Sequence, residues 1–152
     1  MIRKAKITDY NFIRKCRTSL FEHEREYDPS KFRKSLFFDV AAFLHLMLDY
    51  TVMIIHDGVE DVGYITYKII HVKETDVLVN KKYMYIGELY VDKTKRKSKY
   101  ASQAIVSLID AARKLGCEDV RVCCYNQNTD ASQFYKVCEF TPQHTTFIRS
   151  LL

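Results

Sequence analysis

A cluster of basic residues in the middle of the chain has the composition and the setting of an anion-binding loop. Five of the seven residues of Lys93–Lys99 are lysine or arginine. The cluster follows a β-prone segment, Tyr83–Val91, and precedes a run with helical spacing that starts at Ala101. A strand, a loop and a helix in this order direct backbone N–H groups and a helix N-terminus toward an anion. The sequence therefore predicts a phosphate-binding loop here, although an ordinary solvated basic turn would carry the same charge.

A carboxylate in the segment before the loop could act as a general base. Glu88 lies in a mostly apolar strand pattern, where its carboxylate could accept a proton from a substrate. A glutamate that only forms a salt bridge would give the same pattern, and both interpretations stay open. Side chains alternate along a strand, so the pattern predicts two faces: Met84, Ile86, Glu88 and Tyr90 on one, and Tyr83, Tyr85, Gly87, Leu89 and Val91 on the other.

The basic loop resembles the acyl-CoA loop of the GCN5-related N-acetyltransferase family. Arg96-x-x-Lys99-x-Ala101 is similar to the family pattern (Gln/Arg)-x-x-Gly-x-(Gly/Ala), with Lys99 where the family has its central glycine. Glycine at such a position allows a positive φ or a close approach of phosphate to the backbone. Two interpretations of Lys99 follow: its ammonium pairs with the phosphates, or the site no longer binds CoA.

A second motif resembles the family's other signature, Asn…Ala…(Leu/Phe)-Tyr…Gly-Phe. It is the run Asn128–Tyr135 in the register Asn-x-x-Ala-x-x-Phe-Tyr, followed by Phe140, with Glu139 where the family has glycine. The resemblance implies that Tyr135 hydrogen-bonds the CoA sulfur and protonates the leaving thiolate, whereas a core tyrosine is the alternative. Asn128 would bond the pantetheine arm of CoA, cap its own helix, or do both.

The resemblance extends over nearly the whole chain and implies an enzyme. It would use acetyl-CoA, without a metal, to acetylate a primary amine of a small molecule or peptide by direct transfer. A backbone N–H near Val91 would polarise the thioester carbonyl, with Tyr135 and Glu88 as catalytic residues. The alternative is a non-catalytic acyl-CoA-sensing or protein-interaction module on the same fold. The expected co-substrate contacts are Leu89, Val91, Arg96, Lys97, Ser98, Lys99, Tyr100, Ala101, Ser102, Asn128, Ala131 and Tyr135.

An acid-rich segment, Glu22–Asp28, is the candidate entry side for the amine. Its negative charge could attract a cation, and a solvated helix end is the equally open alternative. The residues expected to contact the acceptor are Glu22, Glu24, Tyr27 and Glu88.

Hydrophobic spacing predicts an alternation of strands and helices that positions these residues. Together with the resemblance it indicates an α/β (α+β) fold, a mixed and mostly antiparallel sheet with helices on both faces, in one domain over residues 1–152. Strands are expected at Ile2–Ile7, Thr51–Ile55, Val62–Val72, Tyr83–Val91, Val120–Cys124 and Thr145–Ser150. Helices are expected after an Asp9 cap, from Asp28-Pro29 to about Asp49, from Ala101 to Gly116, and over Asn128–Val137.

The composition argues against several other classes of protein. The 152 residues are 47% hydrophobic, enough for one well-filled core, and no apolar run has the length of a membrane span. The N-terminus lacks the apolar stretch of a secretory signal, so a cytoplasmic protein is expected. Five cysteines and five histidines lack metal-site spacing. The net charge of +5 has only one short basic cluster and no recognised nucleic-acid motif. No nucleic-acid or membrane partner is therefore expected, and a homodimer is left open.

Overall fold

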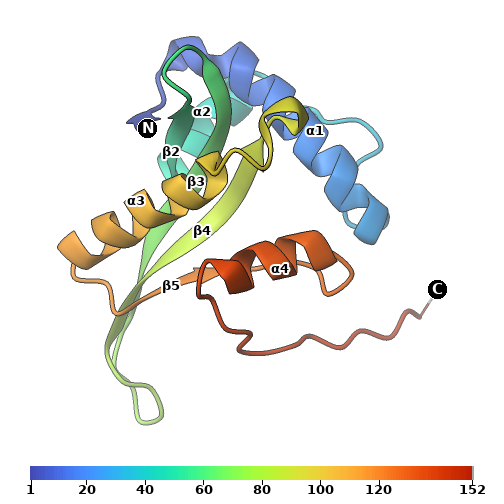
Figure 1. Cartoon of the computed structure of the whole chain (residues 1–152). Coiled ribbons are helices and arrows are strands. Elements are labelled where there is room, and N and C mark those ends of the chain that lie inside the picture. The colour runs from blue at the N-terminus through green and yellow to red at the C-terminus, as the bar shows by residue number, and fades with distance from the viewer. Residues whose placement is uncertain (152) are drawn as a thin grey trace.

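The strands of the chain form one five-stranded sheet, seen in a computed structural model that describes residues 1–151 (Figure 1). Neighbouring strands follow chain order and run antiparallel, except for the last pair, β4 and β5, which is parallel. This confirms the expected mixed, mostly antiparallel sheet with helices on both faces. The strands are β1 (Ile2–Lys4), β2 (Thr51–His56), β3 (Asp61–Val72), β4 (Lys81–Val91) and β5 (Asp119–Val122).

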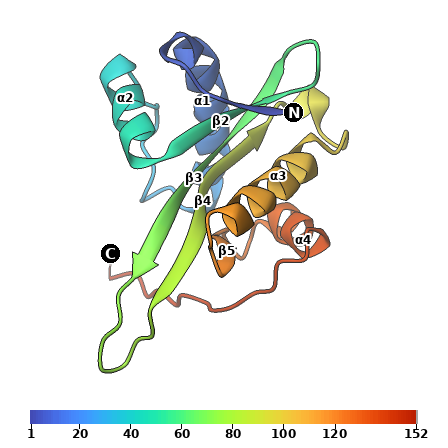
Figure 2. The same cartoon turned by 90° about the vertical axis from the view of Figure 1, so that its left-hand side faces the viewer.

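Within residues 1–151, four α-helices cover the two faces of the sheet. α1 (Tyr10–Tyr27) and α2 (Val40–Asp49) lie on one face, and α3 (Tyr100–Lys114) lies on the other (Figure 2). α4 (Thr129–Val137) follows β5, and its aromatic residues pack into the same hydrophobic cluster as α3. Asp39 begins α2 by accepting a hydrogen bond from the Ala42 N–H at 2.8 Å.

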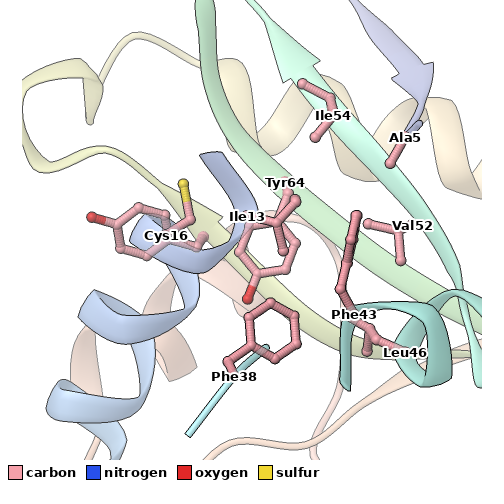
Figure 3. Packing of buried hydrophobic residues seen from close by; sticks show 10 residues of the cluster. Ala5, Ile13, Cys16, Phe38, Phe43, Leu46, Val52, Ile54 and Tyr64 are labelled. Carbon is pink, nitrogen blue, oxygen red and sulfur yellow. The ribbon is translucent and has the colours of Figure 1, made fainter. Parts of the chain in front are cut away.

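The sheet separates two hydrophobic clusters because neighbouring residues of a strand point to opposite faces. Tyr64 of β3 is fully buried with α1 and α2, where Ile13, Phe38 and Phe43 surround its ring (Figure 3). The next residue, Ile65, is buried with α3 on the other face. Each fully buried large apolar side chain contributes about 1.5–3 kcal/mol to folding, so these two clusters fix the helices on the sheet.

The predicted helix from Pro29 is wrong for its first part. Only residues 40–49 are helical, and residues 28–39 form an irregular segment. Tertiary contacts place the aromatic residues of this segment: Phe32 packs on Phe21 with ring centroids 5.5 Å apart, and Phe38 is buried beneath α1. Their apolar spacing suits this loop as well as it suits a helix.

Two other expectations of local structure are also wrong. Asp9 occupies the N-cap position of α1, but its side chain does not cap the helix; the carboxylate instead accepts hydrogen bonds from the Lys6 N–H at 2.7 Å and from the Arg3 guanidinium at 2.9 Å. The expected strand over residues 145–150 does not form, and residues 141–151 run as an extended, exposed segment without regular secondary structure (Figure 1). Within residues 1–151, none of the helices is long and apolar enough to cross a membrane.

Candidate active site

A β-bulge in the middle of β4 determines which side chains face which cluster. Thr66 of β3 pairs with Glu88 and its neighbour Tyr67 pairs with Ile86, so Gly87 is an extra residue in β4. One extra residue reverses the alternation of the side chains that follow it. The sequence prediction of a single face for Met84, Ile86, Glu88 and Tyr90 is therefore wrong: Met84, Ile86, Leu89 and Val91 contact the α3 side, and Glu88 and Tyr90 face α1 and α2.

Gly87 is required at the bulge because two side chains approach its backbone closely. A Cβ atom at this position would lie 2.6 Å from Cε1 of Tyr50 and 2.9 Å from Oγ1 of Thr66. The Thr66 hydroxyl is fully buried and accepts the Glu88 N–H at 2.9 Å, which satisfies the amide that the bulge removes from the strand ladder. Gly87, Tyr50 and Thr66 therefore form the bulge and also fix the position of Glu88.

β4 and β5 separate immediately before the bulge. Their pairing ends at Ile86 and Val122, although β4 continues to Val91. The Asp92 N–H donates to Val62 of β3 at 2.8 Å, and N–H groups alternate in direction along an antiparallel strand. The amides of Leu89 and Val91 therefore face the opening between β4 and β5. The Val91 carbonyl faces the same way, because it accepts a hydrogen bond from Arg96 Nε at 3.0 Å. This opening holds directed N–H donors at the place expected for a thioester carbonyl.

The loop after β4 ends in a group of unpaired N–H donors at the start of α3. The first backbone bond there runs from Gln103 N–H to the Lys99 carbonyl at 2.9 Å. Among residues 1–151, the N–H groups of Tyr100, Ala101 and Ser102 have no hydrogen-bond acceptor. These amides and the positive end of the helix dipole form the arrangement that binds a phosphate group.

The two positions where the resembled family has glycine both adopt left-handed backbone conformations. Lys99 has φ 64° and ψ 3°, and Glu139 has φ 66°. Lys97, in the same loop, also has φ 64°. The loop therefore retains the conformation that favours glycine, although its side chains are not glycine.

The basic residues of the loop divide into those held by the protein and those left exposed. Lys95 forms ion pairs with Asp57 at 3.0 Å and Glu60 at 2.7 Å in the turn between β2 and β3. Within the loop Lys93–Lys99, the ammonium groups of Lys93, Lys97 and Lys99 are exposed and form no ion pair with residues 1–151. These are the charges available to an anionic ligand.

Glu88 is held by a charged network next to a cleft. Arg17 of α1 donates to its carboxylate, with Nη2 2.6 Å from Oε1, and the Tyr64 hydroxyl donates to Oε2 at 2.6 Å. Burial, followed by the charge of Glu88, raises the pKa of Tyr64, so this hydroxyl stays a donor. Glu88 therefore forms a salt bridge, as one of its two interpretations predicted. Its carboxylate also lines a cleft of about 250 Å³.

This cleft contains residues that sequence reasoning missed. Its lining comes from α1, α2 and the bulge of β4: Arg17, Ala42, His45, Leu46, Asp49, Tyr50, Gly87 and Glu88. His45 and Asp49 are four residues apart, so they lie on one face of α2. That polar spacing within an otherwise apolar helix was the available signal for these two residues.

Tyr135 lies on α4 in an aromatic cluster. Its ring centroid is 5.3 Å from that of Phe134 and 5.7 Å from that of Phe140. Burial raises the pKa of its hydroxyl, and nearby Cys124 and Glu24 add to this effect. The phenol is therefore protonated at neutral pH. No hydrogen bond joins its oxygen to any residue of the described chain.

The other expected contacts divide between two places. Asn128 is buried and caps α4, because its side chain accepts the Ala131 N–H at 3.1 Å. Burial raises the pKa of Glu24, whose charge in turn raises the pKa of Tyr135. Tyr27 stacks on Tyr125, which follows β5. Glu22 instead lines a second cleft of about 220 Å³ that shares Arg17 with the first.

The second cleft is mostly basic and aromatic rather than acidic. Besides Glu22 and Arg17, it is lined by Lys31, Arg33 and Lys34 and by Phe21, Phe32 and Phe37. The Lys31 ammonium lies 5.1 Å from the Phe32 ring centroid. No group of three or more metal-ligating side chains that could hold a metal ion is present within residues 1–151.

A family model described as the acetyltransferase (GNAT) family matches residues 17–140, most of the chain. The chain belongs to the GNAT acetyltransferase family. The match begins at Arg17, beside the Glu88 cleft, and ends at Phe140, which packs on Tyr135. It therefore includes both clefts, the loop before α3 and α4.

Solved structures share the fold of this GNAT protein at low sequence identity. The BH1408 protein from Bacillus halodurans, solved as a tetramutant, aligns with a TM-score of 0.93 at 21% identity over 99% of each chain. An aminoglycoside acetyltransferase from an uncultured soil metagenomic sample, in complex with sisomicin, aligns with a TM-score of 0.72 at 18% identity over 100% of this chain and 96% of its own. A glucosamine-6-phosphate N-acetyltransferase from Arabidopsis thaliana aligns with a TM-score of 0.66 at 18% identity over 99% of this chain and 97% of its own. No curated protein sequence matches the chain.

Proposed function

We propose that this GNAT protein is an acetyl-CoA-dependent N-acetyltransferase that acetylates a primary amine of a small molecule or peptide by direct transfer. The separation of β4 from β5 beside Gly87 carries this proposal. Because the strands separate, the amides of Leu89 and Val91 point into an opening. This opening lies between the free N–H groups at the start of α3 and the cleft at Glu88. Acetyl-CoA supplies an activated thioester, and the chain supplies donors at each position where that reaction develops negative charge.

The co-substrate would bind along the α3 side of this opening. The N–H groups of Tyr100, Ala101 and Ser102 would hold the pyrophosphate, and the exposed lysines Lys97 and Lys99 would add positive charge. Arg96, Ser98, Asn128 and Ala131 are further proposed contacts at the loop and at the start of α4. Both left-handed lysines fit this role, because their side chains point to solvent from the same loop.

The transfer step uses a proton donor and a proton acceptor. The amine nitrogen forms a bond to the carbonyl carbon, the carbon–sulfur bond breaks, and the Val91 and Leu89 amides stabilise the oxyanion between these events. Tyr135 donates its phenolic proton to the departing sulfur, which its protonated state at neutral pH allows. Glu88 accepts the proton that the amine loses, directly or through water in the cleft.

The basic second cleft indicates the kind of amine. Lys31, Arg33 and Lys34 outnumber Glu22 there, so an acceptor that carries an anionic group beside its amine is favoured over a polycation. Glu22, Glu24 and Tyr27 remain proposed contacts for the amine end. Among the structural neighbours, this preference corresponds to the amino-sugar phosphate rather than to the aminoglycoside.

Product analysis tests the proposal. We expect purified protein with acetyl-CoA and a panel of amines to yield an acetylated amine and one equivalent of free thiol, with anionic amines preferred. Tyr83→Phe, at the far end of β4 where Tyr83 stacks with Arg121, serves as the matched control for tyrosine variants. CoA binding without an acetylated product for any amine would favour the alternative, a non-catalytic acyl-CoA-sensing module.

The role of Glu88 has a distinct pH signature. Glu88→Gln should lower kcat/KM at neutral pH, and the defect should shrink as the pH approaches the pKa of the amine, about 10 for a primary alkyl amine. Tyr64→Phe is the control, because it removes a hydrogen bond to Glu88 but keeps the negative charge of the Glu88 carboxylate. If Glu88 only anchors Arg17, Glu88→Gln would lower the melting temperature and leave the shape of the pH profile unchanged.

A further inference from the structure

Arg17 of α1 lies between the two clefts and lines both of them. Its Nε lies 3.0 Å from Oε2 of Glu88 and its Nη2 lies 2.6 Å from Oε1, so one edge of the guanidinium holds the carboxylate. Nη1 takes no part in this ion pair. A guanidinium carries N–H donors along more than one edge of its plane. The edge formed by Nη1 and Nη2, named here the free edge of Arg17, therefore remains outside the ion pair.

Aromatic rings fix the orientation of this guanidinium. Its central carbon lies 5.1 Å from the ring centroid of Phe21 and 4.6 Å from that of Phe38. Phe38 is buried beneath α1, and Phe21 lines the second cleft. The cation–π contacts and the ion pair together keep the plane of the guanidinium in one position. A donor edge that is already fixed binds an oxyanion with little loss of side-chain freedom.

The second cleft has the surroundings that an oxyanion on an apolar body requires. Lys31, Arg33 and Lys34 form no ion pair within residues 1–151, and Glu22 is the one carboxylate among the lining residues. Positive charge therefore exceeds negative charge around the cleft. The apolar part of the lining consists of Phe21, Phe32, Leu36 and Phe37.

We propose that the free edge of Arg17 binds a carboxylate or phosphate group of the acceptor, whose apolar body packs on the phenylalanines of the second cleft. Arg17 holds Glu88 with one edge and the oxyanion of the acceptor with the other, so it determines which amines are accepted. Because one side chain contacts both partners, the amine and the oxyanion must lie close together on the acceptor. Carboxylate and phosphate both match a planar pair of N–H donors.

The selection of an amine rests on the proposed function, whereas binding of the oxyanion requires no acetyl transfer. Probes without an amine therefore test the anion site alone. Ligand-observed NMR titration of the wild type should detect benzoate or phenyl phosphate, and the tighter of the two identifies the preferred group. Benzamide, the neutral analogue of benzoate, should bind at least about tenfold more weakly, because an ionised acceptor forms stronger hydrogen bonds to a guanidinium.

Arg17→Lys removes the free edge and keeps a positive charge beside Glu88. A lysine ammonium has no second planar edge, so this variant should lose most of the preference for the anions over benzamide. Arg14→Lys is the matched control, since Arg14 lies on the exposed side of the same helix and lines neither cleft. Thermal melts of both variants verify that they fold.

A negative charge placed in the second cleft tests the location of the site without changing Arg17. Phe37 lines this cleft and is 73% exposed, so Phe37→Asp should fold normally. It should weaken the binding of both anions by about tenfold, and most strongly at low salt, because the two negative charges repel each other. Leu48→Asp is the matched control, since Leu48 is 83% exposed on α2 and lines neither cleft.

Acceptor kinetics connect the anion site to acetyl transfer. Wild type should acetylate an aminomethyl benzoate with a higher kcat/KM than its neutral amide, mainly through a lower KM, and Arg17→Lys should remove this preference. Anion binding without an acetylated product from any amine would contradict the proposed function and leave the anion site standing. Equal affinities of wild type for benzoate, phenyl phosphate and benzamide would overturn the inference. Anion binding that is unchanged in a folded Arg17→Lys, or in Phe37→Asp, would overturn it as well.

Discussion

At the scale of single residues, Tyr135 offers the clearest separation of catalysis from packing. Tyr135→Phe keeps the ring contacts with Phe134 and Phe140 and removes only the hydroxyl. We expect kcat to fall by about 10²–10⁴, the usual contribution of a positioned acid, with acetyl-CoA affinity little changed. Steady-state kinetics with calorimetric titration measure the two effects. An unchanged kcat would assign Tyr135 to the hydrophobic core alone.

Lys99 separates backbone strain from charge. A left-handed lysine costs about 1–2 kcal/mol, whereas glycine loses about 0.5–1 kcal/mol of chain entropy, so Lys99→Gly should raise the free energy of unfolding slightly. Lys99→Ala keeps the Cβ atom and removes the charge. It should weaken CoA binding severalfold, more at low salt, because an exposed charge is screened as ionic strength rises.

Thermal melts and CoA titrations of both Lys99 variants at two salt concentrations measure these effects. Equal CoA affinities for wild type and both variants would show that the lysine does not contribute to phosphate binding. A stability loss in Lys99→Gly would show that other contacts hold the lysine in its left-handed conformation.

At the scale of elements, the bulge of β4 organises the site. Gly87→Ala would place a methyl group 2.6 Å from the Tyr50 ring, and overpacking of this kind costs about 1–3 kcal/mol. We expect a lower melting temperature and weaker acceptor binding, because Tyr50, Gly87 and Glu88 line one cleft. Adding Tyr50→Leu should recover much of the stability, and the double-mutant cycle measures that coupling. Additive effects would contradict the contact with Tyr50 as the cause.

The elements also show what could be predicted from the sequence. Long periodic segments such as α3 and β3 were predicted correctly because their apolar spacing matches one face of a helix or strand. The bulge could not be predicted, since Gly87 is an ordinary residue in a period-two pattern until β3 and Tyr50 pack against it. The same dependence on tertiary contacts explains the irregular segment 28–39.

The candidate site was only partly accessible from the sequence for a similar reason. Local motifs indicated the loop before α3 and the start of α4, where neighbouring residues form the contacts. Arg17 and His45 were missed, because they reach Glu88 and its cleft from helices distant in sequence. The charge of the second cleft arises from residues 31–34, which the expected helix would have distributed around its surface.

At the scale of the whole molecule, the proposed function assigns different roles to the two faces of the sheet. The α3 side carries the amides and exposed lysines to which the proposed function assigns the anionic co-substrate, and the α1–α2 side forms two clefts around Arg17. β4 lies between them and contributes to both through its bulge. The proposed function requires that acetyl-CoA binds at the N-terminus of α3.

Calorimetric titration of acetyl-CoA into wild type, Ser102→Asp and Ser107→Asp tests that claim most directly. Both serines lie on α3 and donate their hydroxyls to backbone carbonyls, but only Ser102 lies in the first turn. An aspartate in the first turn interacts favourably with the helix dipole, so the variant should still fold, whereas its negative charge repels a pyrophosphate. We predict one acetyl-CoA per chain for wild type and Ser107→Asp, and affinity reduced at least about tenfold for Ser102→Asp. Absence of binding to wild type at millimolar acetyl-CoA, or equal affinities for all three proteins, would contradict the account.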